Sequence, residues 1–431
     1  MRFQLPFSPN LLSLIDTSSS LTLRWNGALV SGTAQLPASK SESNRALIIR
    51  ALAGAGQLHN LSDANDTELM QRLLAEPATT TTLDAEDAGT VMRFLTAYLA
   101  VTGRQVLLTG TARMRQRPIG VLVDALRQLG ARIDYTEQEG YPPLQLRGWV
   151  PQLTAQEPAE LSVRGDISSQ YISALMMVGP QLPGGLRLRL TGKVGSRPYI
   201  RMTQSLMQHF GGQCRDLGEV IEVRPQAYQP ADYTIESDWS AASYWYAMVA
   251  LAPRGSSITL PGLRRHSWQG DQAIVGIMAQ LGVATRFEEH GVMLTQQACA
   301  EAIEQDFTDC PDLAQTVAVV AAAVGVPLVL TGLESLRIKE TDRIAALQAE
   351  LAKFGGALVD EGDGRFRVPV AGFTVAGQTV ETYHDHRMAM AFAPLALRGS
   401  LTILAPAVVR KSYPQFWLEL RKAGFEVTEQ A

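Results

Sequence analysis

The sequence predicts an α/β fold of two pseudo-symmetric domains, each made of three repeated helix–strand units packed around buried parallel helices. Two observations lead to this prediction: a motif that recurs six times, and the nearly constant distance between its later copies. The length agrees, because 431 residues exceed what a single hydrophobic core usually holds.

Each copy of the motif consists of a short polar turn, a strongly apolar helix, and usually a Gly or Pro just beyond it. The copies are anchored on Ser41, Thr90, Ser168, Ser240, Asp312 and His386. Successive anchors are separated by 49, 78, 72, 72 and 74 residues, so the first unit is predicted to be trimmed. Any α/β protein has some helices that are followed by Gly, but nearly equal spacing over the last four units is hard to obtain by accident.

The segments between the apolar helices also follow a pattern. An alternating apolar strand comes after the helix, as in 105–110 (QVLLTG) and 327–332 (PLVLTG). A second, amphipathic helix then ends in Gly and leads into another strand, as in 125–135 (ALRQLGARIDY). Three units on each side give predicted domains of residues 37–234 and of residues 1–36 plus 235–431.

Composition narrows the class of protein. A net charge of −4 gives no reason to expect binding to nucleic acid or an anionic membrane. Three cysteines without a CxxC pair indicate a reducing compartment and argue against structural zinc. Pro6 and Pro9 interrupt the N-terminal apolar run, and no run of 18 apolar residues follows, so a cytoplasmic protein is expected.

The nucleotide and hydrolase motifs that would indicate other chemistries are missing. The chain has no GxxxxGK[ST] motif, no GxGxxG after a strand and no GxSxG. Use of ATP or NAD, and a serine hydrolase mechanism, are therefore unsupported.

Charged and hydroxyl side chains gather at the starts of the apolar helices. A helix start presents free N–H groups and a positive dipole end, which favour phosphates and carboxylates. The residues concerned are Lys40, Ser41, Arg45, Gly89, Thr90, Ser168, Ser169, Gln170, Asp312, His386 and Arg387. This pattern predicts a site for anionic ligands where these helix starts meet.

Further basic clusters lie at 113–117 (RMRQR), 196–199 (SRPY) and 337–343 (RIKETDR). Each alone could be a solvated surface, but together they indicate a pocket for two anionic groups. Asp312 is either a general base beside these cations or a simple helix cap. The HDHR run at 384–387 is a weak metal motif, and we interpret it as anion-binding.

These motifs, in this order, resemble those of the 5-enolpyruvylshikimate-3-phosphate synthase family over nearly all the chain from Pro37 onward. The matching segments are LPASKSESNRAL, DAGTVMR, RMRQRPIG, ISSQY, GSRPYI, PDLAQT, RIKETDR, DHRMAM and RKSYP. The resemblance implies the enolpyruvyl transferase fold, an inside-out α/β barrel in two domains. It also implies transfer of the enolpyruvyl group of phosphoenolpyruvate to the 5-hydroxyl of shikimate-3-phosphate.

The resemblance assigns site residues motif by motif. Shikimate-3-phosphate is expected to contact Lys40, Ser41, Arg45, Ser168, Ser169, Gln170, Ser196, Tyr199, Asp312, Ser335 and Lys339. Phosphoenolpyruvate is expected to contact Lys40, Gly89, Arg117, Gln170, Arg343, Arg387 and Lys411. Asp312 is expected to accept the hydroxyl proton, and Glu340 and Lys40 are candidates for protonating the methylene carbon.

The resemblance implies no metal and no other cofactor. A monomer whose active site is completed when the two halves close on both substrates is expected.

The sequence departs from the family pattern at Ala38, Glu42, Asp87, Phe94 and Ser335, so sensitivity to glyphosate cannot be predicted. Two alternatives stay open. The sister enzyme that acts on UDP-N-acetylglucosamine carries a Cys in a mobile loop, whereas the corresponding stretch here, TGTARMRQRPIG, has none. A catalytically silent relative would be expected to lose charged site residues that this chain keeps.

Overall fold

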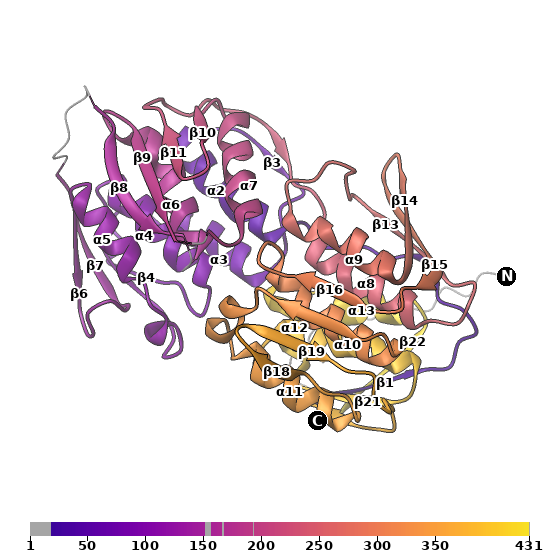
Figure 1. Cartoon of the computed structure of the whole chain (residues 1–431). Coiled ribbons are helices and arrows are strands. Elements are labelled where there is room, and N and C mark those ends of the chain that lie inside the picture. The colour runs from indigo at the N-terminus through magenta and orange to yellow at the C-terminus, as the bar shows by residue number, and fades with distance from the viewer. Residues whose placement is uncertain (1–18, 151–156, 166–167, 193, 431) are drawn as a thin grey trace. The chain divides into compact units, whose positions relative to one another are not determined.

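The computed structural model describes residues 19–150, 157–165, 168–192 and 194–430, which form two compact units (Figure 1). The N-terminal unit comprises residues 38–238 and 266–270. The C-terminal unit comprises residues 19–37, 239–265 and 271–430 of the described chain. Residues 1–18, which the sequence analysis assigns to the second domain, lie outside the described residues.

Each unit has three apolar inner helices, as the repeat predicts. In the N-terminal unit they are α2 (Lys40–Ala53), α4 (Gly89–Val101) and α6 (Ser169–Val178). In the C-terminal unit they are α8 (Trp239–Leu251), α10 (Ala314–Val324) and α12 (His386–Phe392). All six are largely buried. Five of them are predominantly apolar, whereas the first half of α2 buries the polar residues Glu42, Ser43, Asn44 and Arg45.

Five four-stranded sheets share one topology. In each of them, one edge strand runs parallel to its neighbour, and the other two neighbouring pairs are antiparallel. Two lie in the N-terminal unit: β4 (Thr82–Asp84), β5 (Gln105–Thr109), β7 (Leu144–Trp149) and β6 (Ala131–Tyr135); and β8 (Ala159–Arg164), β9 (Leu186–Thr191), β11 (Val220–Val223) and β10 (Cys214–Asp216). The parallel pairs are joined through an inner helix, the usual crossover between parallel strands.

The other three four-stranded sheets belong to the C-terminal unit. They are β2 (Ser31–Thr33), β13 (Ser257–Pro261), β15 (Gly291–Cys299) and β14 (Leu281–Glu288); β16 (Ile303–Asp306), β17 (Leu328–Thr331), β19 (Arg365–Val368) and β18 (Val359–Gly362); and β20 (Thr379–Val380), β21 (Leu401–Leu404), β1 (Ser20–Trp25) and β22 (Phe425–Gln430). The early strand β1 thus pairs with the two last strands of the chain, and Figure 1 shows it in indigo among yellow elements.

The first repeat is the short one. Its sheet holds only β3 (Leu58–His59) and β12 (Tyr233–Thr234), which pair in parallel. It lacks the antiparallel pair of the other units, which accounts for the short first spacing in the sequence.

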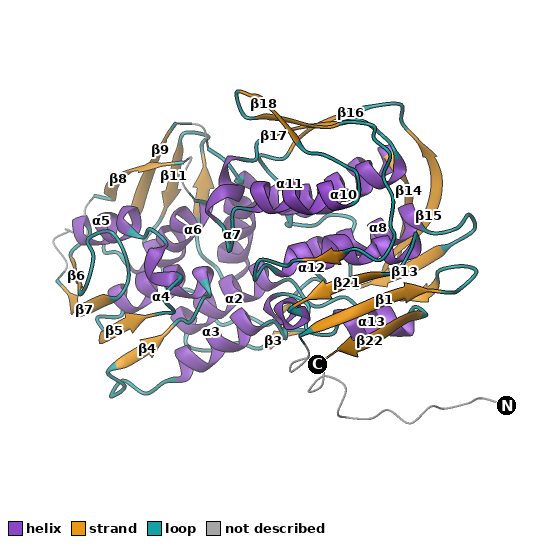
Figure 2. Cartoon of the chain, turned by 90° about the horizontal axis from the view of Figure 1, so that it is seen from below, coloured by secondary structure: helices purple, strands orange, loops and turns teal. Residues whose placement is uncertain are grey.

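Amphipathic helices lie outside the inner helices (Figure 2). They are α3 (Asn65–Ala75), α5 (Gly120–Gln128), α7 (Arg197–His209), α9 (Ile274–Gln280), α11 (Arg343–Lys353) and α13 (Phe416–Lys422). Four of them lead into a strand through Gly130, Gly211, Gly355 or Gly424, and after α9 the corresponding Gly282 is the second residue of β14; all five glycines have positive φ, as predicted.

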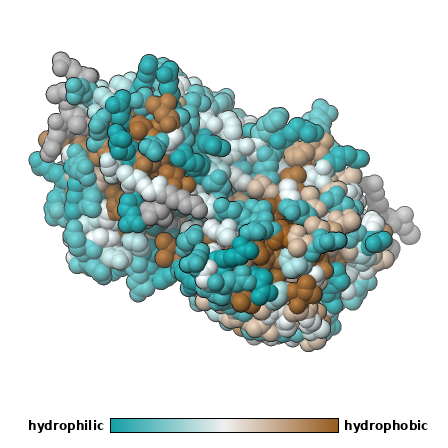
Figure 3. Space-filling model, in the orientation of Figure 1, coloured by the Kyte–Doolittle hydropathy of each residue, from teal (hydrophilic) through white to brown (hydrophobic). Residues whose placement is uncertain are grey.

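Short 3₁₀ helices complete the units: η1 (Met114–Gln116), η2 (Gly179–Gln181), η3 (Gly270–Ala273), η4 (Pro311–Leu313), η5 (Glu334–Ile338), η6 (Ala393–Leu397) and η7 (Pro406–Lys411). Each unit has its own hydrophobic core, and the predicted α/β fold class is confirmed. No helix in the described part of the chain is long and apolar enough to cross a membrane. On the face in Figure 3, hydrophilic and apolar residues are interspersed, as is normal for folded proteins.

Candidate active site

The charged cluster of the C-terminal unit is organised by Arg343, the first residue of α11. Asp342 caps this helix by accepting the N–H groups of Ile344 and Ala345, so the Arg343 side chain leaves from the helix start. Its guanidinium is 2 % exposed. Burial of a guanidinium is costly, and ion pairs and hydrogen bonds offset that cost.

Three carboxylates provide these ion pairs. Arg343 Nε lies 2.6 Å from Asp385 Oδ2, Nη1 lies 2.9 Å from Asp312 Oδ1, and Nη2 lies 2.9 Å from Glu340 Oε2. Burial lowers the pKa of Arg343, but the charges of Asp385, Glu340 and Asp312 outweigh burial and raise this pKa above its ordinary value. The guanidinium is therefore a fixed positive centre that joins three segments far apart in the sequence.

Asp312 lies in η4, just before the inner helix α10. Its Oδ2 is 2.7 Å from Arg387 Nη2, and its Oδ1 is 3.9 Å from Lys339 Nζ as well as close to Arg343. Burial alone would raise the pKa of Asp312, but the cations Arg387, Lys339 and Arg343 outweigh it and hold this pKa well below its usual range. The structure thus places the predicted base among cations, and its side chain does not cap the helix.

The start of α12 presents the second arginine. Asp385 precedes the helix and accepts the N–H of Arg387 at 2.8 Å while it also pairs with Arg343. Arg387 Nη1 donates at 3.4 Å to the hydroxyl of Tyr244, an inner-helix residue whose pKa burial raises to about 12. A neutral phenol and a carboxylate therefore fix the direction of the Arg387 side chain.

Two lysines complete this cluster. Lys411, in η7, lies 3.8 Å from Glu340 Oε1, and Lys339 follows η5. Burial, together with the repulsion of Arg343, lowers the pKa of Lys339. Among the described residues, this cluster holds four cations and three carboxylates, so its cations outnumber its carboxylates. Ser335 lies half-buried in η5, four residues before Lys339.

In the N-terminal unit, Lys40 begins α2, which Ser39 caps by accepting the N–H of Glu42. Lys40 Nζ lies 3.2 Å from Asp66 Oδ2, at the start of α3. Glu42, the departure from the family pattern next to the predicted site, is buried and accepts a hydrogen bond from the Tyr233 hydroxyl. It is held within the fold by that contact and does not project into solvent.

Arg45 is a buried cation with neutral partners. Its Nε donates to Thr203 Oγ1 at 2.7 Å, its Nη2 to Ser173 Oγ at 3.0 Å, and its Nη1 to the Ser41 carbonyl at 2.9 Å. No carboxylate in the described part of the chain forms an ion pair with it, and burial lowers its pKa to about 10. A buried positive charge of this kind favours an anionic ligand.

Two aromatic rings flank the same guanidinium. Its carbon lies 5.2 Å from the Phe94 ring centroid and 5.6 Å from that of Tyr199. Rings at this distance attract a cation and restrict its orientation. Phe94, one of the departures from the family pattern, therefore helps to hold Arg45.

Gly89, the first residue of α4, is approached by two guanidinium groups. A Cβ atom at this position would lie 2.5 Å from Arg93 Nη1 and 2.8 Å from both Nη atoms of Arg117. Arg93 donates to the Gly89 carbonyl at 3.0 Å and lies over the ring of Tyr171. The absent side chain at Gly89 lets these guanidinium groups come close to the helix start.

The starts of α6 and α7 supply the hydroxyl groups. Ser168 caps α6 by accepting the N–H of Gln170, and Gln170 Nε2 donates at 3.0 Å to Thr90 Oγ1 at the start of α4. Ser169 is the first residue of α6. Ser196 precedes α7 with φ of 56°, a left-handed conformation that is uncommon outside Gly.

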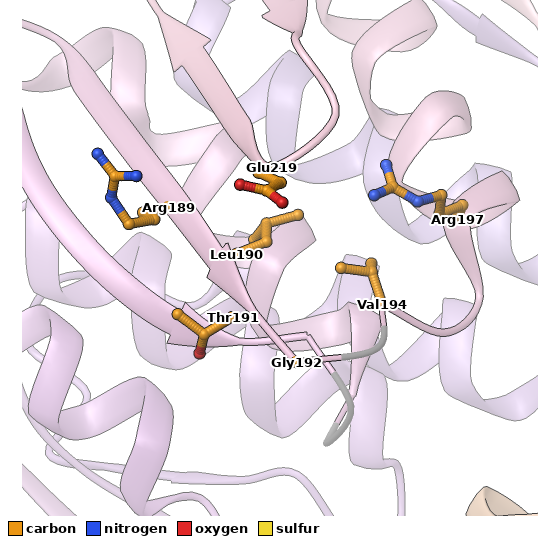
Figure 4. A pocket seen from close by; sticks show the side chains of 7 residues that line it. All are labelled: Arg189, Leu190, Thr191, Gly192, Val194, Arg197 and Glu219. Carbon is orange, nitrogen blue, oxygen red and sulfur yellow. The ribbon is translucent and has the colours of Figure 1, made fainter.

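Three arginines of the predicted basic pocket form ion pairs. Arg115 pairs with Glu137 at 2.8 Å, Arg197 with Asp216 at 3.5 Å, and Arg337 with Asp342 and Asp360. Their place in an anion pocket stays a prediction. Arg197 also borders a cavity of about 450 Å³ (Figure 4).

None of the predicted site residues lines that cavity. Its walls are Arg189, Leu190, Thr191, Gly192, Val194, Arg197 and Glu219.

Sequence reasoning missed three residues of the site. Asp385 could have been found as the N-cap before a helix, and Arg93 by its position four residues after Gly89 on the same helix face. Phe94 carries no sequence signal for its contact with Arg45. In the described part of the chain, no group of three His, Cys, Asp or Glu residues is placed to hold a metal ion.

Comparison with known proteins decides the family. The family model "EPSP synthase (3-phosphoshikimate 1-carboxyvinyltransferase)" matches residues 71–420. The chain belongs to this family. A 3-phosphoshikimate 1-carboxyvinyltransferase of Bacteroides fragilis is 50 % identical over 405 residues, covering 92 % of this chain and 96 % of the relative. The enzyme of the same name from Sodalis glossinidius is 37 % identical over 432 residues, covering 91 % and 95 %.

Solved structures support the fold. The EPSP synthase of Acinetobacter baumannii aligns with a TM-score of 0.77 at 21 % identity, covering 95 % of this chain and all of that one. The enolpyruvyl transferase NikO of Streptomyces tendae aligns with a TM-score of 0.70 at 15 % identity, covering 96 % and 99 %. At these identities the likeness concerns the fold alone.

The buried pair of Arg343 and Asp385 gives a stability prediction. Asp385→Asn removes the charge of a fully buried carboxylate and should lower the free energy of unfolding by about 3–5 kcal/mol, because a buried guanidinium loses a partner. Urea denaturation followed by circular dichroism measures the change.

Glu304→Gln is the matched control, since it breaks the exposed pair with Arg365 in the same unit. It should change stability little. Equal losses in the two variants would contradict a special role for the buried pair.

Proposed function

We propose that the two groups of side chains described above perform the reaction of the family on this chain. That reaction transfers the enolpyruvyl group of phosphoenolpyruvate to the 5-hydroxyl of shikimate-3-phosphate and releases phosphate, a step of aromatic amino-acid biosynthesis. The family model and the 50 % identical relative support the reaction. The single structural observation that carries the assignment of roles is the ion-paired position of Asp312 among Arg343, Arg387 and Lys339.

The charges of the substrates fit the charges of the protein. Both substrates carry one phosphate and one carboxylate, so four anionic groups must be bound. We assign Arg343, Arg387 and Lys411 to phosphoenolpyruvate from the C-terminal unit, and Lys40, Gly89, Arg117 and Gln170 from the N-terminal unit. This assignment uses the excess positive charge of the first cluster and the paired guanidinium groups near Gly89.

Shikimate-3-phosphate is assigned to the neutral hydroxyl groups and the buried arginine of the N-terminal unit. We assign to it Lys40, Ser41, Arg45, Ser168, Ser169, Gln170, Ser196 and Tyr199, and from the C-terminal unit Asp312, Ser335 and Lys339. Arg45 is the strongest of these assignments, because its buried charge has only neutral partners. Its anionic partner would then be a group of the substrate.

The reaction needs one base and one acid. As the 5-hydroxyl oxygen forms a bond to C2 of phosphoenolpyruvate, its proton passes to Asp312 and the methylene carbon C3 gains a proton. C3 then loses a proton while the bond from C2 to the phosphate oxygen breaks. Glu340 and Lys40 are our candidates for the proton transfers at C3.

Substrate binding would adjust the strength of the base. Without substrate, three cations stabilise the ionised form of Asp312 and lower its pKa. When the anionic groups of the substrates pair with Arg343 and Arg387, they offset part of that positive charge and the pKa of Asp312 rises. Asp312 would thus become a better base when both substrates are present.

The alternative functions have less support. The relatives from Bacteroides fragilis and Sodalis glossinidius carry the name of the shikimate enzyme. A silent relative has no need for a cluster of four cations and three carboxylates, which is costly to bury.

We also propose a monomer in the cytoplasm. The three cysteines, Cys214, Cys299 and Cys310, are free thiols, as expected in the reducing cytoplasm. Light scattering measures the oligomeric state.

Asp312→Ala tests the proposed base. Removal of a general base should lower kcat by about 10²–10⁴-fold. Binding of phosphoenolpyruvate should be retained, because the variant leaves Arg343 and Arg387 without one of their anionic partners. Phosphate release in the presence of both substrates measures kcat, and calorimetry measures binding.

Asp309→Ala, three residues earlier on the chain, is the control and should keep wild-type kcat. If the intact chain released no phosphate, or did so only with UDP-N-acetylglucosamine, the proposed function would be wrong. An Asp312→Ala enzyme with normal kcat would leave the function standing and refute only the role of this residue.

Phe94→Leu tests the role of the ring beside Arg45. Loss of a buried cation–π contact of about 0.5–2 kcal/mol should raise KM for shikimate-3-phosphate by about 2–30-fold. KM for phosphoenolpyruvate should change less.

Phe210→Leu is a matched control, because this ring is equally buried in the same unit. It should lower thermal stability without the change in KM. A rise in KM for both variants would show that core packing, and not the contact with Arg45, is responsible.

A further inference from the structure

The turn that leads into α12 has an unusual backbone. Tyr383 has φ of 52° and His384 has φ of 57°, so two consecutive residues other than Gly adopt the left-handed conformation. Such a residue costs roughly 1–2 kcal/mol and persists only where its surroundings enforce it. The turn is followed at once by Asp385 and Arg387, which belong to the charged cluster.

A buried carboxylate holds this turn. Glu350 is fully buried in α11. Its Oε2 accepts the N–H of Glu381 at 3.2 Å, and its Oε1 accepts the hydroxyl of Tyr383 at 2.8 Å. Burial and the bond to Glu350 raise the pKa of Tyr383 to about 12, so the phenol stays a donor.

Other contacts support the same arrangement. Lys353 Nζ lies 2.8 Å from Glu350 Oε2 and also donates to the Thr379 carbonyl at 3.0 Å. The side chain of Glu381 accepts the N–H groups of Thr382 and Tyr383, both at 3.1 Å. The turn is therefore tied to α11 through a charge-assisted network.

One helix thus controls both ends of the turn. Arg343, at the start of α11, binds Asp385 at the far end of the turn. Glu350 lies seven residues later, about 10 Å along the helix and on nearly the same face, and binds the near end. The position of α12 and of Arg387 is set relative to α11 by these two contacts.

We propose that Glu350 is a positioning residue for the reaction. It enforces the left-handed turn at Tyr383–His384 and thereby sets the place and direction of Arg387. The proposal rests on the proposed function, since Arg387 is there assigned to phosphoenolpyruvate. The side chain of Glu350 binds Glu381, Tyr383 and Lys353, so its effect on Arg387 is transmitted through the backbone of the turn.

Glu350→Gln is the primary test. The amide keeps the shape of the side chain but loses the charge that binds Lys353 and strengthens the bonds to the turn. A guanidinium displaced by about 1 Å can cost up to about 100-fold, so we expect KM for phosphoenolpyruvate to rise by about tenfold. KM for shikimate-3-phosphate should stay within about twofold, because Arg387 is not assigned to that substrate.

Glu419→Gln is the matched control. Glu419 is a buried carboxylate on α13 of the same unit, accepts a backbone N–H from Gln35 at 2.9 Å and pairs with Lys422, three residues later, at 2.7 Å. This variant should lose stability in the same way as Glu350→Gln but keep the wild-type KM for both substrates. An equal rise in KM for phosphoenolpyruvate in both variants would overturn the proposal.

Substitutions of His384 test the turn itself. This exposed residue has a left-handed backbone, which Asn tolerates and the β-branched Val does not. His384→Asn should keep the wild-type KM, and His384→Val should raise KM for phosphoenolpyruvate as Glu350→Gln does.

The outcomes separate the two proposals. If the wild-type chain is inactive with both substrates, the proposed function fails. If the wild type is active and Glu350→Gln loses thermal stability without any change in KM or kcat, the function stands and the positioning role is wrong.

Discussion

The C-terminal unit depends on one interaction, the buried guanidinium of Arg343 surrounded by Asp312, Glu340 and Asp385. Arg343 keeps its proton, and its buried charge is met by three carboxylates in fixed positions. These carboxylates come from η4, from the segment before α11 and from the start of α12. The repeated helix–strand units of the C-terminal unit therefore place these three segments next to one another.

The buried arginines of the N-terminal unit have neutral partners in place of carboxylates in the described part of the chain. Arg45 and Arg93 are buried among hydroxyl groups, backbone carbonyls and aromatic rings, without an ion pair in the described part of the chain. Neutral partners orient a guanidinium but leave its charge to be met by a ligand. The C-terminal unit supplies carboxylates that can also act in proton transfer. One unit is thus suited to holding anions, and the other to both holding anions and moving protons.

The sequence predicted the features that depend on local pattern. The six apolar helices, the strands after them and the positive-φ glycines follow from periodicity and helix-end chemistry. It did not predict that β1 pairs with β21 and β22, because such partners are distant in the chain. It also did not predict the ion pairs of Arg115 with Glu137 and of Arg197 with Asp216, since side-chain direction and nearby carboxylates are not visible in a motif. The sequence also did not predict that Phe94 packs beside Arg45 or that Glu350 binds the turn before α12, because both contacts depend on packing between elements.

The central claim is that nearby cations lower the pKa of Asp312, and that anionic substrate raises this pKa by pairing with the same cations while Asp312 stays ionised. The direct measurement is the carboxyl ¹³C signal of Asp312 as a function of pH, assigned by its loss in Asp312→Asn and recorded without and with phosphoenolpyruvate. We predict that, in the free protein, the pKa of Asp312 lies well below the ordinary aspartate value, and that phosphoenolpyruvate raises it. A pKa at or above the ordinary value in the free protein, or one unchanged by phosphoenolpyruvate, would contradict the account.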